Sequence, residues 1–105
     1  MKQNIIYMTV KDEAEAKKIA EELLNKRLVA CANIFPIKSM YWWKKKIEKE
    51  DEIVMILKTK KKIVNKTMRS IRRMHSDEVS CIDVIEVDKA DKNYLKWIDE
   101  VTRKK

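Results

Sequence analysis

The sequence predicts an α+β fold: a ferredoxin-like βαββαβ sandwich with a long hairpin between its second and third strands and an extra C-terminal helix. Four apolar, β-branched runs have the character of strands, and three other segments carry apolar residues at helical spacing. The second of the four runs is much longer than an ordinary strand. With 105 residues the chain suits one hydrophobic core, so we expect a single domain over residues 1–105.

The first strand and the first helix follow from local patterns. Residues 4–10 (NIIYMTV) are apolar and β-branched, which is typical of a central strand buried on both faces. Asp12 is then placed to cap a helix, and Glu15 three residues later completes a pattern similar to a capping box. The expected apolar side of this helix comprises Ala16, Ile19, Ala20, Leu23 and Leu24.

Residues 30–46 indicate one very long strand. At roughly 3.3 Å per residue it spans on the order of 55 Å, whereas a compact domain of about 100 residues has a radius of gyration of about 13 Å. The strand must therefore extend beyond its own domain. Pro36 interrupts it and indicates a bulge or an edge position, where the pairing partner can change.

Residues 52–60 (EIVMILKTK) predict the return strand of the hairpin, because they hold a continuous apolar run. The tip between the two strands is expected to carry charges that discourage edge-to-edge aggregation. The residues expected at this tip are Lys45, Lys46, Glu48, Lys49, Glu50 and Asp51.

Three adjacent aromatic residues, Tyr41, Trp42 and Trp43, lie on the projecting part of this hairpin. Successive side chains of a strand point to opposite faces, so the two tryptophans cannot share one core. One of them faces the chain's own layer, and the other needs cover from elsewhere. A second copy of the chain is the simplest cover, so these three residues are predicted to form a subunit interface.

The second half of the chain predicts a helix, a strand and a final helix. Residues 61–75 form the helix, and residues 79–87 (VSCIDVIEV) form the strand. Asp91 caps the final helix. The apolar stripe of the first of these helices contains Val64, Met68, Ile71 and His75, and its basic stripe contains Lys62, Lys66, Arg69 and Arg73. The apolar face of the final helix contains Tyr94, Leu95, Ile98 and Val101, beside Trp97.

Such a sandwich leaves one sheet face bare, because both crossover helices lie on the other face. Burying the bare face takes the terminal helix, a partner, or both. This requirement agrees with the subunit interface expected from the tryptophans.

Composition excludes several classes of function. The chain has no glycine, and both the P-loop and the GxGxxG dinucleotide turn require glycine. No segment is apolar enough for a membrane span and no leader precedes the first strand, so we expect a cytoplasmic protein without a membrane partner. Cys31 and Cys81 lie in apolar runs without CxxC spacing, which predicts buried, reduced, structural cysteines.

The formal net charge of +8 makes nucleic acid a candidate partner. Trp42 and Trp43 beside a run of lysines resemble a stacking platform for a single strand. RNA-recognition modules, however, carry their aromatics on central strands within a glycine-containing signature. Residues 52–60 have no aromatic at all, so we expect no specific nucleic-acid partner.

His75 is the only histidine and is the one candidate for metal or acid–base chemistry. Ser76 and Asp77 follow it directly, but adjacent residues do not easily converge as a triad, and no glycine-built nucleophile turn is present. We therefore expect no enzyme and no catalytic residues. Met74 precedes His75, and an imidazole with a thioether favours copper(I), although both residues also suit plain packing.

Six ordered segments carry a resemblance to a known family over essentially the whole chain. They are RLVACANI (27–34), SMYWWK (39–44), KIE (46–48), ILKT (56–59), HSDEV (75–79) and YLKWI (94–98). The chain resembles the CutA family of divalent-cation tolerance proteins. This resemblance implies a ferredoxin-like homotrimer whose long hairpins pack around a three-fold axis, without established enzymatic activity, with a role in metal-ion homeostasis or sensing.

The same resemblance implies a metal site, and it shows positions at which this chain differs from the usual family sequence. Copper-binding members use a strand-one cysteine and a His-His pair, and the matching positions are Met8, Met74 and His75. Copper(I) is therefore the expected ion. The family usually has glycine, an aromatic residue and proline where this chain has Lys45, Asp77 and Ser80. We expect the hairpin to tolerate lysine unless its φ angle is positive, whereas a pocket lined by the missing aromatic is affected.

Two alternatives from other classes stay open at this point. One is a single-stranded nucleic-acid binding module that uses the positive charge and Trp42 and Trp43. The other is a small-ligand signalling trimer with a pocket between subunits, by analogy with the trimeric nitrogen-regulatory signal proteins that the family architecture resembles.

Overall fold

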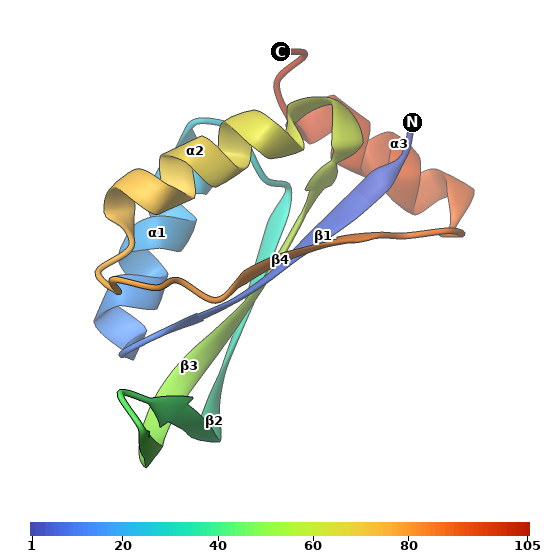
Figure 1. Cartoon of the computed structure of the whole chain (residues 1–105). Coiled ribbons are helices and arrows are strands. Elements are labelled where there is room, and N and C mark those ends of the chain that lie inside the picture. Colours follow the sequence, from blue (N-terminus) through green and yellow to red (C-terminus); the bar gives the residue numbers. More distant parts are fainter.

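The computed structural model describes residues 1–105 and has the predicted βαββαβ order with an extra helix. Its four-stranded antiparallel sheet has the strand order β2-β3-β1-β4. Helices α1 and α2 lie on one side of this sheet, and α3 lies near the N-terminal end of β1 (Figure 1). This arrangement confirms the ferredoxin-like α+β class. The elements are β1 (Gln3–Val10), α1 (Glu13–Asn25), β2 (Cys31–Trp43), β3 (Lys46–Lys60), the 3-10 turn η1 (Lys61–Ile63), α2 (Val64–Met74), β4 (Ile82–Glu86) and α3 (Lys92–Val101).

The core lies between the sheet and the two crossover helices. Alternate residues of β1 and β3 face the helices, as the period of two in a strand requires. The fully buried members of this cluster include Ile6, Met8, Val10, Ile19, Leu23, Met55, Leu57 and Ile71. The prediction of a central β1 is confirmed, because β1 pairs with β3 on one side and with β4 on the other.

Helix α1 begins where the cap was predicted. The Asp12 carboxylate accepts a hydrogen bond from the Glu15 backbone N–H at 2.8 Å. Glu15 reaches back to the N–H of Lys11 at 3.3 Å, one residue before the position expected for a capping box. Leu24 was predicted on the apolar side of α1, but it is 41% exposed and lies at the margin of the buried stripe.

The predicted tip of the hairpin was wrong. The turn contains only Lys44 and Lys45, and β3 starts at Lys46, so the remaining residues predicted at the tip lie within the β3 ladder. The ladder keeps one register from Cys31↔Lys58 to Trp43↔Lys46, without a bulge. Pro36 lies on β2, an edge strand, which confirms the edge alternative: the missing N–H of proline is harmless on the side that no strand pairs with.

The fourth strand is shorter than predicted, and this changes the environment of a cysteine. β4 pairs only with β1, and the last paired residues are Met8 and Ile82. Cys81 therefore lies outside the strand and is exposed, while Cys31 is half-buried. Both thiols are free, as predicted, but neither is in the core.

Helix α3 covers only one end of the second sheet face. The Asp91 carboxylate accepts hydrogen bonds from the backbone N–H groups of Asn93 and Tyr94, which confirms the predicted cap. The Lys58 ammonium lies 5.7 Å from the centre of the Tyr94 ring. Ile98 is the fully buried anchor of the helix. None of the helices has both the length and the apolar character needed to cross a lipid bilayer.

Candidate functional site: the hairpin arm and the His75 turn

The hairpin arm, defined as residues 37–52, extends past the rest of the sheet. The pairing between β1 and β3 ends at Val10↔Ile53, and Ile53 is the residue opposite Pro36. Beyond that point β2 and β3 pair only with each other, as far as Trp43↔Lys46. Both outer edges of the arm therefore lack a strand partner. Figure 1 shows the arm leaving the body of the protein at the bottom of the view.

The arm closes in a two-residue turn with unusual backbone angles. Lys44 and Lys45 have φ angles of 48° and 67°. A type I′ hairpin turn requires positive φ at both central residues, and glycine or asparagine usually occupies them. The tolerance expected for Lys45 was conditional on a negative φ, and that condition is not met. Lys44 gains some compensation, because its ammonium lies 5.7 Å from the centre of the Trp43 ring.

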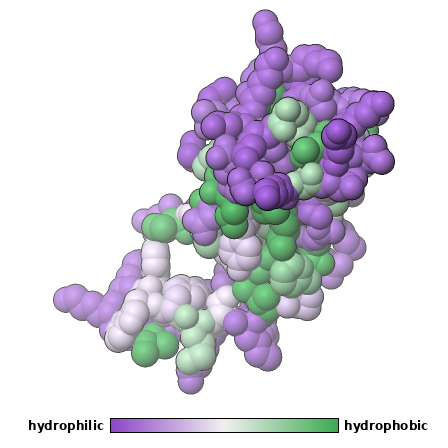
Figure 2. All heavy atoms as spheres, turned by 90° about the vertical axis from the view of Figure 1, so that its right-hand side faces the viewer, coloured by the Kyte–Doolittle hydropathy of each residue, from purple (hydrophilic) through white to green (hydrophobic).

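The arm carries apolar side chains that nothing in this chain covers. Trp42 is 72% exposed and Met40 is 69% exposed. Ile47, 55% exposed, is the cross-strand neighbour of Trp42 and therefore lies on the same face. Trp43 is half-buried on the opposite face. In Figure 2 the arm projects at the lower left, with aromatic and apolar residues at its surface.

Apolar residues also remain on the sheet face that α1 and α2 do not cover. Ile85 is 52% exposed and lies opposite the half-buried Ile5 in the β1–β4 ladder. Phe35 is 41% exposed on β2. Figure 2 shows a band of hydrophobic residues between the polar upper part of the molecule and the arm. The arm and the bare sheet face thus both leave large apolar side chains uncovered, which is unusual for a monomer.

The His75 turn, defined as residues 75–81, joins α2 to β4. His75 is the residue after the last turn of α2, and its Nε2 lies 2.7 Å from the carbonyl oxygen of Thr9. Its Nδ1 accepts a hydrogen bond from the Asp77 backbone N–H at 3.1 Å. Because a carbonyl oxygen can only accept, Nε2 carries the proton and the ring is the neutral tautomer. Both ring nitrogens are therefore engaged by backbone groups.

The three residues predicted to bind copper come from β1 (Met8) and from the end of α2 (Met74 and His75). Met8 precedes Thr9, the residue that His75 contacts, and Met74 packs against the core cluster that includes Met8. Met8 is fully buried, so its sulfur faces side chains of the core. In this arrangement the ring offers a free lone pair only if Nδ1 releases the Asp77 N–H. No group of three or more His, Cys, Asp or Glu side chains gathers anywhere in the molecule.

Glu15 anchors the His75 turn, a role that sequence analysis missed. One of its carboxylate oxygens accepts the Ser76 N–H at 2.9 Å, and the other accepts the Lys11 N–H at 3.3 Å. Partial burial raises the pKa of Glu15, but the hydrogen bonds from Ser76 and Lys11 outweigh burial and lower its pKa below its ordinary value. The contact to Ser76 joins residues far apart in sequence, so no local pattern signals it.

A buried lysine is the second feature that sequence analysis missed. Lys60, at the end of β3, has a side chain that is only 2% exposed, and its Nζ lies 2.8 Å from the Asp99 carboxylate of α3. The hydrogen bond and charge of Lys60 lower the pKa of Asp99 below its ordinary value. This ion pair fixes α3 against the sheet at the end opposite the arm.

Comparisons with known proteins agree with this geometry. The sequence model of the family described as CutA1 divalent ion tolerance protein matches residues 4–101. The divalent-cation tolerance protein CutA of Archaeoglobus fulgidus is 44% identical over 97 residues, which are 92% of this chain and 95% of that protein. The corresponding protein of Pyrococcus horikoshii is 39% identical over 100 residues, which are 95% of this chain and 98% of that protein.

Solved structures give the same result. The structure described as the periplasmic divalent cation tolerance protein CutA from Archaeoglobus fulgidus has a TM-score of 0.92 at 43% identity, and covers 94% of this chain and 97% of that one. A crystal structure of CutA1 from Pyrococcus horikoshii has a TM-score of 0.93 at 38% identity, and covers 96% of this chain and 99% of that one. The chain belongs to the CutA1 divalent ion tolerance protein family.

Proposed function

We propose that this protein is a non-enzymatic homotrimer that acts in divalent-cation tolerance and responds to metal ions. The observation that supports assembly is the hairpin arm. Its two unpaired strand edges and its uncovered Trp42 are features that a soluble protein normally covers. Arms from two further copies supply both strand partners and apolar cover, as the family resemblance implies.

Burial of apolar side chains would contribute substantially to the free energy of assembly. Trp42, Met40 and Ile47 are each more than half exposed in the single chain. Burying a large apolar side chain contributes about 1.5–3 kcal/mol, so these residues can hold a stable assembly once three arms meet. Because the same arm is repeated in every copy, each subunit gives and receives these contacts.

Size-exclusion chromatography coupled to light scattering tests this assembly directly. At micromolar concentration we expect a mass three times that of one chain, with no dissociation on further dilution through the micromolar range. A species with the mass of a single chain would contradict the proposed trimer.

Copper(I) is the metal ion that we propose for this chain. Two observations support it. Met74 directly precedes His75, and Met8 directly precedes Thr9, whose carbonyl oxygen His75 contacts, so two soft thioether residues adjoin the contact in the chain. The Asp77 N–H that occupies Nδ1 belongs to an exposed residue. The ring must release that N–H before Nδ1 can bind a metal, so we expect modest affinity. A competition titration against a copper(I) chelator tests the proposal, and no transfer of copper to the protein would contradict it.

We also propose a cytoplasmic location. It is supported by two free cysteines, one of them exposed, because exposed free thiols persist in reducing compartments. The periplasmic description belongs to the Archaeoglobus protein. Alkylation of the native protein in intact and in lysed cells tests the location, and a protein already oxidised in the cell would contradict it.

A further inference from the structure

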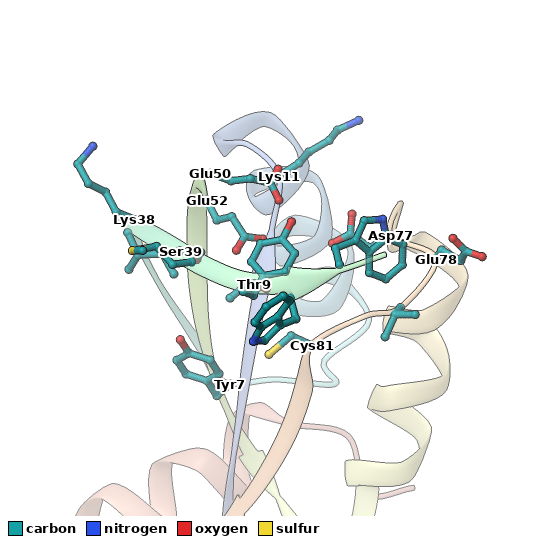
Figure 3. Close-up of a pocket in the computed structure, with 16 residues that line it drawn as sticks. Tyr7, Thr9, Lys11, Lys38, Ser39, Glu50, Glu52, Asp77, Glu78 and Cys81 are labelled. Atoms are coloured by element: carbon teal, nitrogen blue, oxygen red, sulfur yellow. The ribbon is translucent and has the colours of Figure 1, made fainter. Parts of the chain in front are cut away.

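Residues 53–76 hold the whole net charge of the chain. They contain eight lysines and arginines and no aspartate or glutamate, whereas the rest of the chain contains 17 residues of each sign. This segment runs from β3 through η1 and α2. Elsewhere the two signs are mixed: beside the hairpin arm, for example, Lys11 and Lys38 lie among the carboxylates of Glu50, Glu52 and Asp77 (Figure 3). The positive charge is therefore a local property of one segment.

The basic stripe of α2, defined as Lys62, Lys66, Arg69 and Arg73, has no ionic partner in the chain. Lys66 is half-buried and the other three residues are exposed. None of the four takes part in an ion pair. Successive members are three or four residues apart, so they follow one side of the helix over about 16 Å.

The basic stripe lowers the stability of the helix that carries it. Like charges three or four residues apart repel each other. Lys62 also lies at the start of the helical segment, where positive charge is unfavourable and where no acidic residue is present. The packing of α2 uses its other side, with Val64 and Ile71 in the core. Local structure therefore does not account for the stripe, and an anionic partner would offset its repulsion.

The stripe offers positive charge and little else. No aromatic or large apolar side chain is exposed between residues 61 and 76. The stripe thus lacks the apolar surface that a helix inserts into a membrane, the rings on which single-stranded bases stack, and the aromatic anchors typical of protein interfaces. It also lies on the outside of a helix, and neither the pocket beside the arm nor the hollow beside Trp97 includes any of its residues.

We propose that the basic stripe binds the phosphate backbone of double-stranded DNA. A DNA duplex presents one negative charge per about 1.7 Å of its axis, so a row of four cations meets phosphates along its whole length. Arg69 and Arg73 can each hold a phosphate through two hydrogen bonds. Phosphate contacts carry no sequence information. The binding is therefore independent of sequence, in keeping with the prediction of no specific nucleic-acid partner.

Assembly through the hairpin arm would leave the stripe free. Helix α2 lies on the side of the sheet opposite the bare face, and the arm leaves the molecule away from α2, at the bottom of the view (Figure 1). Covering the arm and the bare face does not cover α2. The inference therefore rests neither on the trimer nor on metal binding.

Fluorescence anisotropy with a short labelled DNA duplex tests the proposal on the full chain. We expect binding at about 50 mM NaCl, with a slope of log K against log[NaCl] of about −3 to −4, because each neutralised phosphate contributes about −0.9. Two duplexes of unrelated sequence should bind equally. Absence of binding at this salt concentration, or a clear preference for one sequence, would overturn the proposal.

Matched variants locate the surface. Arg69→Gln combined with Arg73→Gln should reduce the slope by about 2 and weaken binding about tenfold at about 50 mM NaCl. Lys89→Gln combined with Lys96→Gln removes the same charge from exposed positions outside the stripe and should leave the slope unchanged. The stripe variant should unfold at an equal or higher urea concentration, because repulsion is relieved. Equal losses of binding in both variants would overturn the assignment, since net charge alone would explain them.

Other polyanions distinguish the remaining partners. We expect the DNA duplex to bind more tightly than polyglutamate, phosphatidylserine vesicles, an RNA duplex or a single-stranded oligonucleotide. Tighter binding of polyglutamate or of the vesicles would overturn the proposal in favour of an acidic protein or a membrane. Tighter binding of the RNA duplex would make RNA the partner instead. Tighter binding of the single strand, lost in Trp42→Ala, would move the site to the arm.

Discussion

His75 donates a hydrogen bond from Nε2 to the carbonyl oxygen of Thr9 across 66 positions of the sequence, at a distance of 2.7 Å. This bond ties the end of α2 to the central strand β1. It also fixes the tautomer, so that Nδ1 accepts the Asp77 N–H. The ring that sequence analysis assigned to a metal thus has a structural role, and any metal binding must compete with it.

Copper(I) binding should be weak and should depend on the thioethers as well as on the ring. We expect at most one ion per chain. His75→Ala should abolish binding, and Met74→Leu, which keeps the volume of the side chain, should weaken it. Cys31→Ser should leave it intact. Chelator competition measures all three variants, and a signal that survives His75→Ala but disappears with Cys31→Ser would move the site to the cysteine.

The trimer should depend on Trp42 more than on Trp43, because Trp42 is 72% exposed in the single chain and Trp43 is half-buried. Trp42→Lys should lower the mass measured by light scattering to that of one chain at micromolar concentration, since a buried unpaired charge is costly. Leu24→Lys is the matched control, because Leu24 is exposed on α1 and should not affect assembly. An unchanged mass for Trp42→Lys would place the interface elsewhere.

The partly buried ion pair between Lys60 and Asp99 should stabilise the fold. Asp99→Asn leaves the Lys60 ammonium, 2% exposed, without its anionic partner at 2.8 Å. We expect the free energy of unfolding to fall, because the buried Lys60 ammonium then lacks a charged partner. Asp88→Asn breaks only a solvent-exposed contact of 3.9 Å to Lys2. This variant should change the free energy of unfolding by less than about 1 kcal/mol. Urea titration compares the two.

The carboxylate of Glu15 should make the fold less stable in acid. Its pKa in the folded protein lies below its ordinary value. Its contribution is therefore present above the unfolded pKa and is lost as the pH falls through the folded pKa. Glu15→Gln should cost about 1 kcal/mol of unfolding free energy near neutral pH, and this difference should shrink at about pH 3.

Glu13→Gln is the control for that measurement, because Glu13 is exposed on the same helix turn and contacts only Lys17. The same loss for Glu15→Gln at both pH values would show that packing, and not the charge, is responsible.

Glycine at the hairpin turn should stabilise the protein. Lys45 has φ of 67°, a conformation that costs an L-residue about 1–2 kcal/mol and glycine very little. Part of that gain is offset by the greater freedom of glycine in the unfolded chain. Lys45→Gly should therefore raise the unfolding free energy by about 0.5–1 kcal/mol. Lys46→Gly, one residue into β3, should lower it, and a loss in both variants would contradict the turn geometry.

Local patterns were sufficient to predict the helices and the order of helices and strands along the chain, and they limited Pro36 to a bulge or an edge position. Predictions from local patterns failed where the structure depends on contacts between residues far apart in the sequence. Strand β4 pairs only with β1, and this pairing ends at Met8 and Ile82. Cys81 therefore lies outside the strand and is exposed. The predicted hairpin tip contained too many residues, because its charged residues suggested a loop. In the structure Lys46, Glu48 and Glu50 are all paired in the β2–β3 ladder.

The candidate site was less accessible to sequence analysis than the fold. Tyr41, Trp42 and Trp43 were recognisable as a surface because their spacing alone forces side chains onto both faces of a strand. The partners of His75 and Glu15 were not, because Thr9 and Ser76 are separated from them along the chain by two strands and at least one helix. Backbone acceptors and donors of this kind leave no mark in composition or periodicity.

The continuous register of the arm also has a consequence for the order of folding. Pairing between β2 and β3 can proceed residue by residue outward from Lys44 and Lys45, with only a short loop to close, and such hairpins form within microseconds. β1 must instead find β3 across the intervening helix and strand, which is slower. The arm can therefore nucleate the sheet, so that Lys45→Gly accelerates refolding while Asp99→Asn, at the far end, mainly accelerates unfolding.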